Sequence, residues 1–282
     1  MKKIIFYLLL VLCYSPVQAQ TEIPLEIADG GYLFIKVNLN GTDTARFMLD
    51  TGGGINVISG ALFTKLKGTM KLIGPHTGTR HNGESITGNL YLLPSLSVGS
   101  FSKTNIVVGE YAGLNGFDGL LSMDYFRDTP FTIDFINKKL IIETPRSLAG
   151  ISAKAEKIPI RLKKNGKYEL DFFVKICIND SLDAEAEFDT GAGFAMLMLH
   201  PDYLKKLGIT ISPKTTQGMG YYIYSTTLPK LSYCDVPSLI QLNHFVGFKE
   251  GLIYESLIGS GMFSRSKLTI DIPASKMYVV GN

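Results

Sequence analysis

Short runs in which apolar or β-branched residues alternate with polar ones fill most of the chain, and turn residues separate them. Such runs are typical of half-buried β-strands, so the pattern predicts an all-β fold, with its first strand at 21–26. Two turn pairs, Asn40-Gly41 and Asn179-Asp180, lie between strand-like runs. Both pairs tolerate positive φ angles and therefore predict tight hairpins.

Two segments have the pattern of a short helix. Residues 201–208 begin with Pro201, which a first helical turn tolerates, and end with Gly208, which favours a helix end. Residues 61–67, followed by Gly68, are the corresponding segment of the first half. The expected fold is therefore mainly β with a few short helices.

The two halves of the chain repeat each other. The tripeptide Asp-Thr-Gly occurs at 50–52 and again at 189–191, 139 residues later, each time after an apolar strand-like run. Residues 37–49 align without a gap with 176–188. Later landmarks recur in the same order: Leu93-Pro94 with Leu228-Pro229, Leu120-Leu121 with Leu257-Ile258, and Thr132-Ile133-Asp134 with Thr269-Ile270-Asp271. Matched landmarks in one order indicate an internal repeat.

The repeat predicts two lobes, residues 20–144 and 158–282. Between them, residues 145–157 have weak periodicity, small residues and few bulky apolar ones, so a linker is expected there.

The N-terminus has the pattern of an export signal. Lys2 and Lys3 precede the apolar run 4–14, and the small-residue spacing of 17–19 predicts cleavage after Ala19. A signal peptide at 1–19 implies a periplasmic or extracellular protein. The apolar run is shorter than the about 20 residues that cross a bilayer, and no later run is longer, so no membrane span is expected.

The formal net charge of +3 includes both signal lysines, so the remaining chain is nearly neutral. This balance favours neither nucleic acid nor an anionic membrane as a partner. No cofactor and no metal are expected either, because the four histidines show no spacing of metal ligands.

Cys177 and Cys234 follow the expected cleavage point and lie in the second half. A disulfide between them is possible in an exported protein. The repeat, however, places Cys177 inside a strand and Cys234 in a hairpin, and offers no geometry that brings them together. The sequence leaves both states open.

These motifs resemble the bacterial retropepsin-like aspartic protease family, with two such lobes fused. The first half, from Asp50 to Ile142, carries the pattern most completely. The resemblance implies an exported aspartic-type endopeptidase, a hydrolase that cleaves a peptide or protein substrate. It also implies two pseudo-twofold-related acid-protease lobes of the closed β-barrel type. Since one chain holds both lobes, a monomer is expected to suffice.

The resemblance assigns a role to each residue of the two tripeptides. Asp50 and Asp189 are implied to be the catalytic pair that activates a water and shares one proton. Thr51 and Thr190 are implied to bond across to the opposite lobe. Gly52 and Gly191 would let the backbone pass close to the carboxylates.

The element implied to brace each active-site loop ends in Gly259 in the second lobe but in Ser122 in the first. A side chain at Ser122 is expected to displace the first loop slightly if close backbone approach needs glycine. This departure favours the alternative function, a non-catalytic peptide-binding bilobal module with a degenerate protease cleft. Two facing carboxylates argue against that alternative, because their repulsion costs stability.

Hairpin flaps that close over a bound peptide are expected in both lobes. Asn82 and Gly83 form a good hairpin tip in the first lobe, and Gly220 and Tyr221 lie in the matching part of the second. The tyrosines of the second segment fit a half-buried strand surface equally well.

Glu187 precedes Asp189 by two residues, so strand alternation places both side chains on one face. One hypothesis is that Glu187 lines a specificity pocket beside the catalytic pair and favours a basic substrate side chain. The alternative is a carboxylate that is paired with a neighbouring cation or turned to solvent.

Overall fold

The computed structural model describes residues 20–210, 216–218 and 221–281, without the side chains of 216–218 and 221–223. The expected signal peptide at 1–19 and Gly220 lie outside the described residues. Among the described residues, no helix has the length and apolar character needed to cross a membrane.

The strands of the first half close into a six-stranded barrel, because β2 pairs with β6 as well as with β3. A further strand, β5, extends the sheet beyond β6. The ring order is β2 (Leu33–Leu39), β3 (Asp43–Leu49), β8 (Gly119–Leu121), β4 (Asn56–Ser59), β7 (Phe101–Tyr111) and β6 (Ser85–Val98), with β5 at Lys71–Thr79 and helix α2 at Gly60–Leu66.

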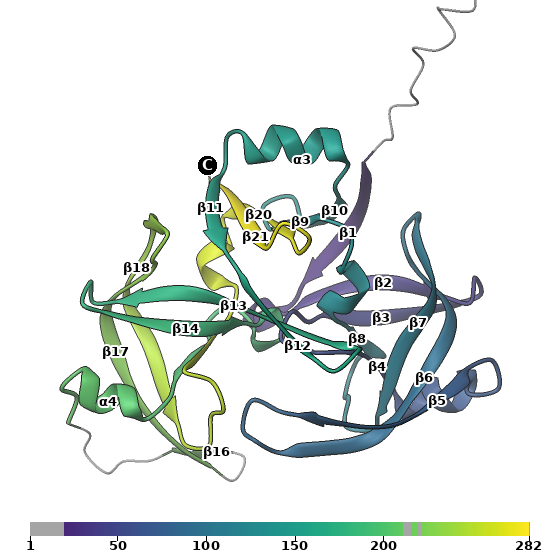
Figure 1. Cartoon of the computed structure of the whole chain (residues 1–282), viewed down its shortest axis with the longest axis horizontal. Coiled ribbons are helices and arrows are strands. Elements are labelled where there is room, and N and C mark those ends of the chain that lie inside the picture. The colour runs from purple at the N-terminus through teal and green to yellow at the C-terminus, as the bar shows by residue number, and fades with distance from the viewer. Residues whose placement is uncertain (1–19, 211–215, 219–220, 282) are drawn as a thin grey trace, which may run out of the picture.

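The second half repeats this ring, and the pairing of β13 with β17 closes it. Its order is β13 (Glu169–Ile178), β14 (Leu182–Phe188), β19 (Ser256–Ile258), β15 (Leu197–Leu199), β18 (Val236–Lys249) and β17 (Tyr221–Tyr233), with β12 (Arg161–Asn165) and β16 (Thr216–Gly218) outside the ring and helix α4 at Asp202–Lys206. The two barrels lie side by side in Figure 1. The predicted fold class, mainly β with two related lobes, is confirmed.

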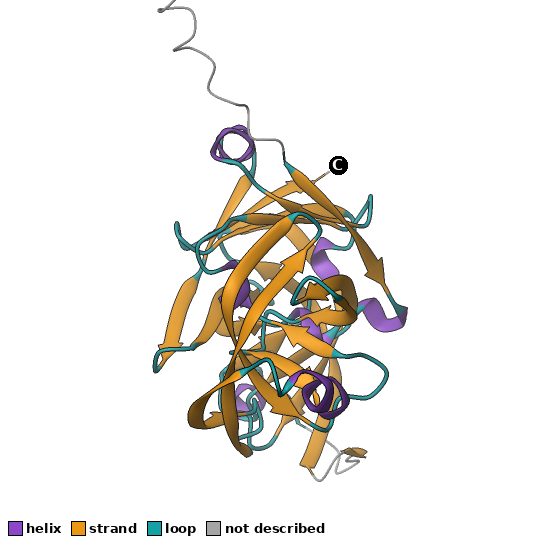
Figure 2. Ribbon diagram, turned by 90° about the vertical axis from the view of Figure 1, so that its right-hand side faces the viewer, coloured by secondary structure: helices purple, strands orange, loops and turns teal. Residues whose placement is uncertain are grey.

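A third sheet joins the two halves. The central pair, β9 with β20, has one strand from each half and sets Thr132 opposite Thr269. The strand order is β11 (Glu156–Pro159), β21 (Lys276–Gly281), β20 (Ser266–Asp271), β9 (Phe131–Asp134), β10 (Lys139–Ile142) and β1 (Thr21–Ile27). Figures 1 and 2 show this sheet above the barrels, with the C-terminus beside it.

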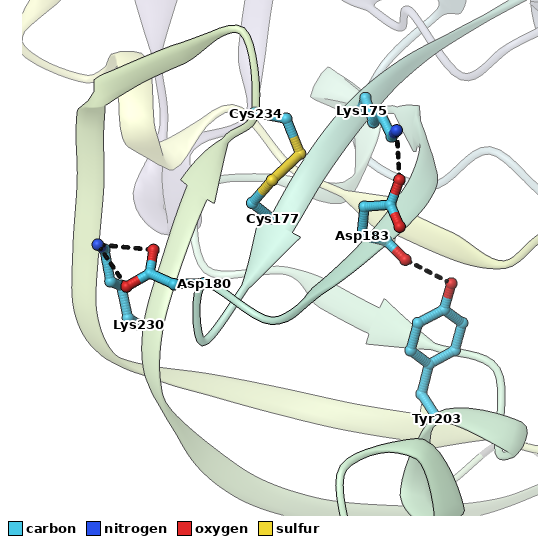
Figure 3. The surroundings of a disulfide bond; sticks show 7 residues. All are labelled: Lys175, Cys177, Asp180, Asp183, Tyr203, Lys230 and Cys234. Carbon is cyan, nitrogen blue, oxygen red and sulfur yellow. Dashed lines mark hydrogen bonds and ion pairs between the residues drawn. A yellow bond between two sulfur atoms is a disulfide. The ribbon is translucent and has the colours of Figure 1, made fainter.

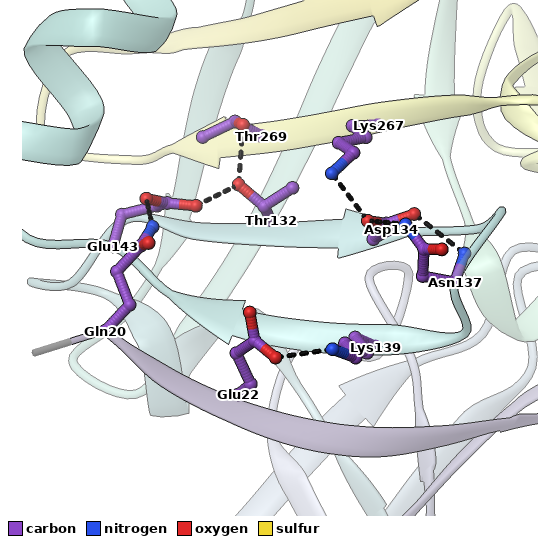
Figure 4. A network of polar contacts seen from close by, with 9 residues as sticks. All are labelled: Gln20, Glu22, Thr132, Asp134, Asn137, Lys139, Glu143, Lys267 and Thr269. Carbon is purple, nitrogen blue, oxygen red and sulfur yellow. Dashed lines mark hydrogen bonds and ion pairs between the residues drawn. The ribbon is translucent and has the colours of Figure 1, made fainter.

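Polar contacts at the middle of the joining sheet are buried. The Thr132 hydroxyl donates to a carboxylate oxygen of Glu143 at 2.5 Å. Because the Thr132 hydroxyl has only that one hydrogen, it accepts from the Thr269 hydroxyl, 2.7 Å away. Lys267 of the second half pairs with the buried Asp134 of the first at 2.8 Å. Figure 4 shows this network spanning both halves. The sheet is therefore held by side chains as well as by its backbone ladder.

The hairpin turns form where the sequence predicts them. Asn40 and Gly41 have φ of 53° and 76°, and Asn179 and Asp180 have 51° and 57°. Each turn delivers the return strand, β3 or β14, whose alternate residues fill the barrel core. The two predicted helices form as α2 and α4, and Gly208 ends the second with φ of 64°.

The segment 145–157, expected to join the lobes, contains helix α3 (Pro145–Ser152) and the start of β11. Thr144 caps this helix, since its hydroxyl accepts from the Ser147 amide and the Ser147 side chain bonds back to the Thr144 amide. Such a capping box, followed by Pro145 in the first turn, explains why a segment of small residues is helical.

Cys177 and Cys234 form a disulfide, with 5.1 Å between their Cα atoms. The sequence offered no geometry for it, yet β13 and β17 pair directly beside it, with Ile176 opposite Tyr233. Figure 3 shows the bond between these strands, near the ion pairs Lys175–Asp183 and Lys230–Asp180. The bridge therefore fastens the seam at which the second barrel closes.

Replacing both cysteines with alanine should lower the free energy of unfolding by about 2–4 kcal/mol, because the bond closes a loop of 57 residues. Denaturant unfolding of the oxidised protein and of the variant measures the difference. Reduction of the unaltered protein is the matched control and should reproduce the loss. Equal stability of all three forms would show that the seam does not need the bridge.

Candidate active site

The two Asp-Thr-Gly loops meet at the boundary between the barrels. Asp50 follows β3 and Asp189 follows β14, and each is held by the neighbouring strand of its own barrel. The Asp50 amide donates to the Leu121 carbonyl at 3.0 Å, and the Asp189 amide donates to the Ile258 carbonyl at 2.8 Å. The two loops therefore leave their barrels in equivalent ways.

The threonines cross between the lobes. The Thr51 hydroxyl donates to the Phe188 carbonyl at 2.6 Å and accepts from the Thr190 amide at 2.9 Å. The Thr190 hydroxyl does the same in reverse, donating to the Leu49 carbonyl at 2.6 Å and accepting from the Thr51 amide at 3.1 Å. Both threonines are fully buried. These four bonds fix one loop against the other with pseudo-twofold symmetry.

The glycines bring each loop against the opposite carboxylate. A Cβ at Gly52 would lie 2.5 Å from Cγ of Asp189, and a Cβ at Gly191 would lie 2.7 Å from Oδ1 of Asp50. No side chain fits in either place, so glycine is required at both. Oδ1 of Asp189 is buried and has no hydrogen-bond partner among the described residues. The sequence motifs thus bring both aspartates to one point.

Burial and mutual repulsion shape the titration of the pair. The pKa of Asp189 is raised well above its usual range, first by burial and then by the charge of Asp50. Burial also raises the pKa of Asp50, against hydrogen bonds that favour its charged form. Oδ1 of Asp50 accepts from the Gly53 amide at 2.8 Å and from the Gly52 amide at 3.1 Å. Burial and the mutual charge therefore favour a resting pair that shares one proton.

The first loop is braced by a side-chain pair that the sequence did not reveal. Oδ1 of Asn56 accepts from the Ser122 amide at 3.0 Å and from the Ser122 hydroxyl at 3.3 Å. In the second lobe, a Cβ at Gly259 would lie 2.0 Å from the Gly193 carbonyl oxygen. Glycine is thus required at 259 only, and the loop displacement expected from Ser122 does not occur. A polar residue at 56 opposite the hydroxyl at 122 was the available signal.

The aspartyl protease family model matches residues 35–125, which hold the first loop and its bracing element. The chain has an aspartyl-protease-like fold. Comparison with curated protein sequences finds no match.

Solved structures extend the likeness to both lobes. Conglutin gamma, a basic 7S globulin from lupine seeds, has a TM-score of 0.55 at 10% identity, over 93% of this chain and 95% of its own. Basic 7S globulin from soybean has a TM-score of 0.56 at 10% identity, over 92% and 94%. At this identity the likeness shows the fold alone, and both proteins are described as globulins.

The expected flap tip of the first lobe, Asn82 and Gly83, lies in the turn between β5 and β6. Gly83 has φ of 82°, which suits its place in a tight turn. In the second lobe, Tyr221 begins β17 and pairs through its backbone with Gly218. Each barrel therefore carries a strand pair that extends outside its ring.

Glu187 is buried, with 3% of its surface exposed, and no described cation forms an ion pair with it. Both alternatives to the pocket hypothesis, a salt bridge and a solvent-facing carboxylate, are therefore wrong for the described residues. Burial raises its pKa well above the usual range, and the charges of Asp189 and Asp171 raise it further. The charge on Glu187 thus interacts with that on Asp189 and Asp50.

A cavity of about 340 Å³ is lined by Glu185, which precedes Glu187 by two residues on β14. Its walls include Phe173, Tyr254 and Lys163. The rings of Phe173 and Tyr254 meet edge to face at 5.1 Å, and burial, helped by the charge of Glu187, raises the pKa of Tyr254. Glu187 therefore lies between this cavity and Asp189.

Replacing Gly259 with serine should destabilise the fold by about 3 kcal/mol, because the new Cβ collides with a backbone oxygen. The mirror change, Ser122→Gly, removes the hydroxyl bond to Asn56 and the cap on η2 (Met123–Phe126) but keeps the amide bond to Asn56, and should cost about 1 kcal/mol. Denaturant unfolding of both variants measures the asymmetry. Equal costs would show that the two loops are braced alike.

Proposed function

We propose that the protein is an aspartic-type endopeptidase that hydrolyses peptide bonds. The observation that carries the proposal is the pair of buried carboxylates, Asp50 and Asp189, set against each other across the lobe boundary. One of them retains a proton and the other is charged, which is the state that acid–base hydrolysis requires.

In the proposed reaction a water bound between the two carboxylates attacks the carbonyl carbon of the scissile bond. The water gives its proton to Asp50, while Asp189 gives its own to the carbonyl oxygen. Collapse of the resulting gem-diol transfers a proton to the nitrogen and breaks the carbon–nitrogen bond. Oδ1 of Asp189, buried without a described partner, marks a polar atom that such a water can satisfy.

We further propose that the protein acts as an exported monomer in a periplasm or outside the cell. The N-terminal sequence supports export, and the disulfide suits an oxidising compartment. Both carboxylates come from one chain, so the pair needs no second copy.

The second candidate function is peptide binding without cleavage. The likeness to two basic 7S globulins favours it, because neither is described as a protease. The bracing of the first loop by Asn56 and Ser122 weakens it, since the departure at 122 leaves the loop in place. A cleft that only binds has no use for two facing carboxylates, which cost stability.

Purified protein should cleave denatured casein at acidic pH, and Asp50→Asn should abolish the activity. Because the pKa of Asp189 is raised, its acid form persists above the usual range of a carboxyl, and activity should fall as pH rises through that pKa. Peptide release measured across about pH 3 to 7 gives the profile.

Asp202→Asn, at an exposed site on α4, is the matched control and should retain full activity. Cleavage that survives Asp50→Asn would point to a contaminant or to another mechanism. Absence of cleavage by the intact, folded protein at every pH would favour the binding module.

We also propose that Glu187 favours a basic substrate side chain beside the scissile bond. Glu187 and Asp171 are both buried, and the described ion pairs include neither. A lysine or arginine side chain would supply the missing counter-ion and lower the raised pKa of Glu187. Burial raises the pKa of Glu187 and the positive charge of Lys163 lowers it, but the described ion pairs do not join the two residues.

Glu187→Gln should lower kcat/KM for substrates with lysine or arginine by about 10- to 100-fold relative to leucine, the range of one charged hydrogen bond. Profiling a peptide library with both proteins measures the change. Glu185→Gln, one step farther along the same strand face, is the control and should keep the preference. An unchanged preference at every subsite in Glu187→Gln would reject the pocket role.

A further inference from the structure

The hairpin of β5 and β6 reaches from the first barrel to the second. Its outer part, with Thr79 opposite Ser85 at the end of the ladder, projects beyond the ring of barrel strands. Figure 1 shows it extending below the gap between the barrels. Its tip touches the turn that follows β18 of the other lobe.

Two hydrogen bonds fasten the tip. The Ile253 amide donates to the His81 carbonyl at 3.0 Å, and Nζ of Lys249 lies 2.6 Å from Nε2 of His81. A Cβ at Gly83 would be in van der Waals contact with Ile253, at 3.5 Å from Cγ2. Lys249 is 1% exposed, so the contact is shielded from solvent.

A second contact lies midway along the hairpin. Nε2 of His76 on β5 is 2.9 Å from Oε1 of Glu169, the first residue of β13. A single hairpin is therefore attached to the opposite lobe at two points that are separated along its length.

Both attachment points adjoin the proposed catalytic site. A Cβ at Gly54, in the first active-site loop, would lie 3.5 Å from Cβ of Glu169. Ile253 precedes Tyr254, whose ring packs against Phe173, the residue opposite Glu187. The attached hairpin therefore contacts the second lobe close to the first active-site loop and to the strand that leads to Asp189.

We propose that this hairpin is a latch that is held against the second lobe at neutral pH through the His81–Lys249 contact and is released by protonation of His81 in acid. Its effect on cleavage rests on the proposed function, but its opening does not. The bond requires a neutral His81, because Nε2 accepts a hydrogen from the Lys249 ammonium. Protonation turns that contact into a repulsion between two cations.

The surroundings of His81 set the direction of the pH response. Burial first of all, together with the charges of Lys249 and Arg80, lowers its pKa to about 4. Glu84 pairs with Arg80 and is the nearest described carboxylate on the same turn. Burial also lowers the pKa of Lys249 to about 8. Every cation facing His81 therefore opposes its protonation while the latch is closed.

Acid favours the open hairpin. The pKa of His81 is depressed in the closed state relative to its ordinary value of 6.5, so the open state binds the proton more tightly. Closure is favoured above about pH 6.5 and weakens as pH falls toward 4. Between pH 7 and pH 4.5 the equilibrium should shift toward the open hairpin by roughly 50-fold.

Variants of the two histidines separate the two contacts. His81→Gln, whose new side chain carries no charge at any pH, should remove the acid response. His76→Gln removes the contact with Glu169 but leaves the His81–Lys249 contact in place, so the acid response should remain.

Hydrogen exchange of the folded Asp50→Asn protein tests the latch without any cleavage. The protection factor of peptides covering 249–254, which contain the Ile253 amide, should fall by roughly 50-fold from pH 7 to pH 4.5. In His81→Gln it should not change with pH. His200→Gln, at an exposed histidine that pairs with Asp202, is the matched control and should respond as the parent does.

Protection that does not change with pH in the parent would overturn the latch, as would an unaltered pH response in His81→Gln. If casein is never cleaved but the exchange behaves as expected, the proposed function fails and the latch stands. If casein is cleaved and the exchange does not respond, the reverse holds.

Discussion

The structure depends on holding two like-charged carboxylates against each other in a buried place. Such a pair is unfavourable by itself, because burial and repulsion both oppose ionisation. The threonine hydroxyls overcome this by bonding across the lobe boundary, each with one donated and one accepted hydrogen bond to the opposite loop. Sharing one proton leaves the pair with a single negative charge, which removes the repulsion between the two carboxylates. The chemistry proposed for the site follows from the same constraint.

Each lobe supplies one of the two Asp-Thr-Gly loops, but the two loops are not supported in the same way. The second loop is packed so closely that only glycine fits at 259, whereas the first uses a hydrogen-bonded pair, Asn56 and Ser122. Both solutions leave the aspartate amides bonded to equivalent carbonyls. Serine at 122 is thus compatible with the site because Asn56 accepts from its amide and its hydroxyl.

Two further features connect the lobes. On one side lies the sheet of six strands, centred on β9 and β20, and on the other the β5–β6 hairpin contacts the second barrel. The sheet is a continuous backbone ladder with a buried polar network, whereas the hairpin is attached by one backbone bond and two side-chain contacts. This difference makes the hairpin the part suited to move.

The sequence by itself determined the features that depend on neighbours along the chain. Turn pairs with positive φ fixed the two hairpins, alternation placed Glu187 on the face of Asp189, and the repeat identified both aspartates. It also marked the departure at Ser122, although not its partner Asn56. These predictions succeed because strand period and turn chemistry are local.

Only the tertiary structure decided which residues that are far apart in the sequence come into contact. The disulfide required β13 and β17 to pair, the burial of Glu187 required the packing around β14, and the contact of His81 with Lys249 joins residues 168 positions apart. Each of these depends on how two closed barrels are set against each other. Local pattern carries no information about that placement, because many relative positions of the lobes satisfy the same strands and turns.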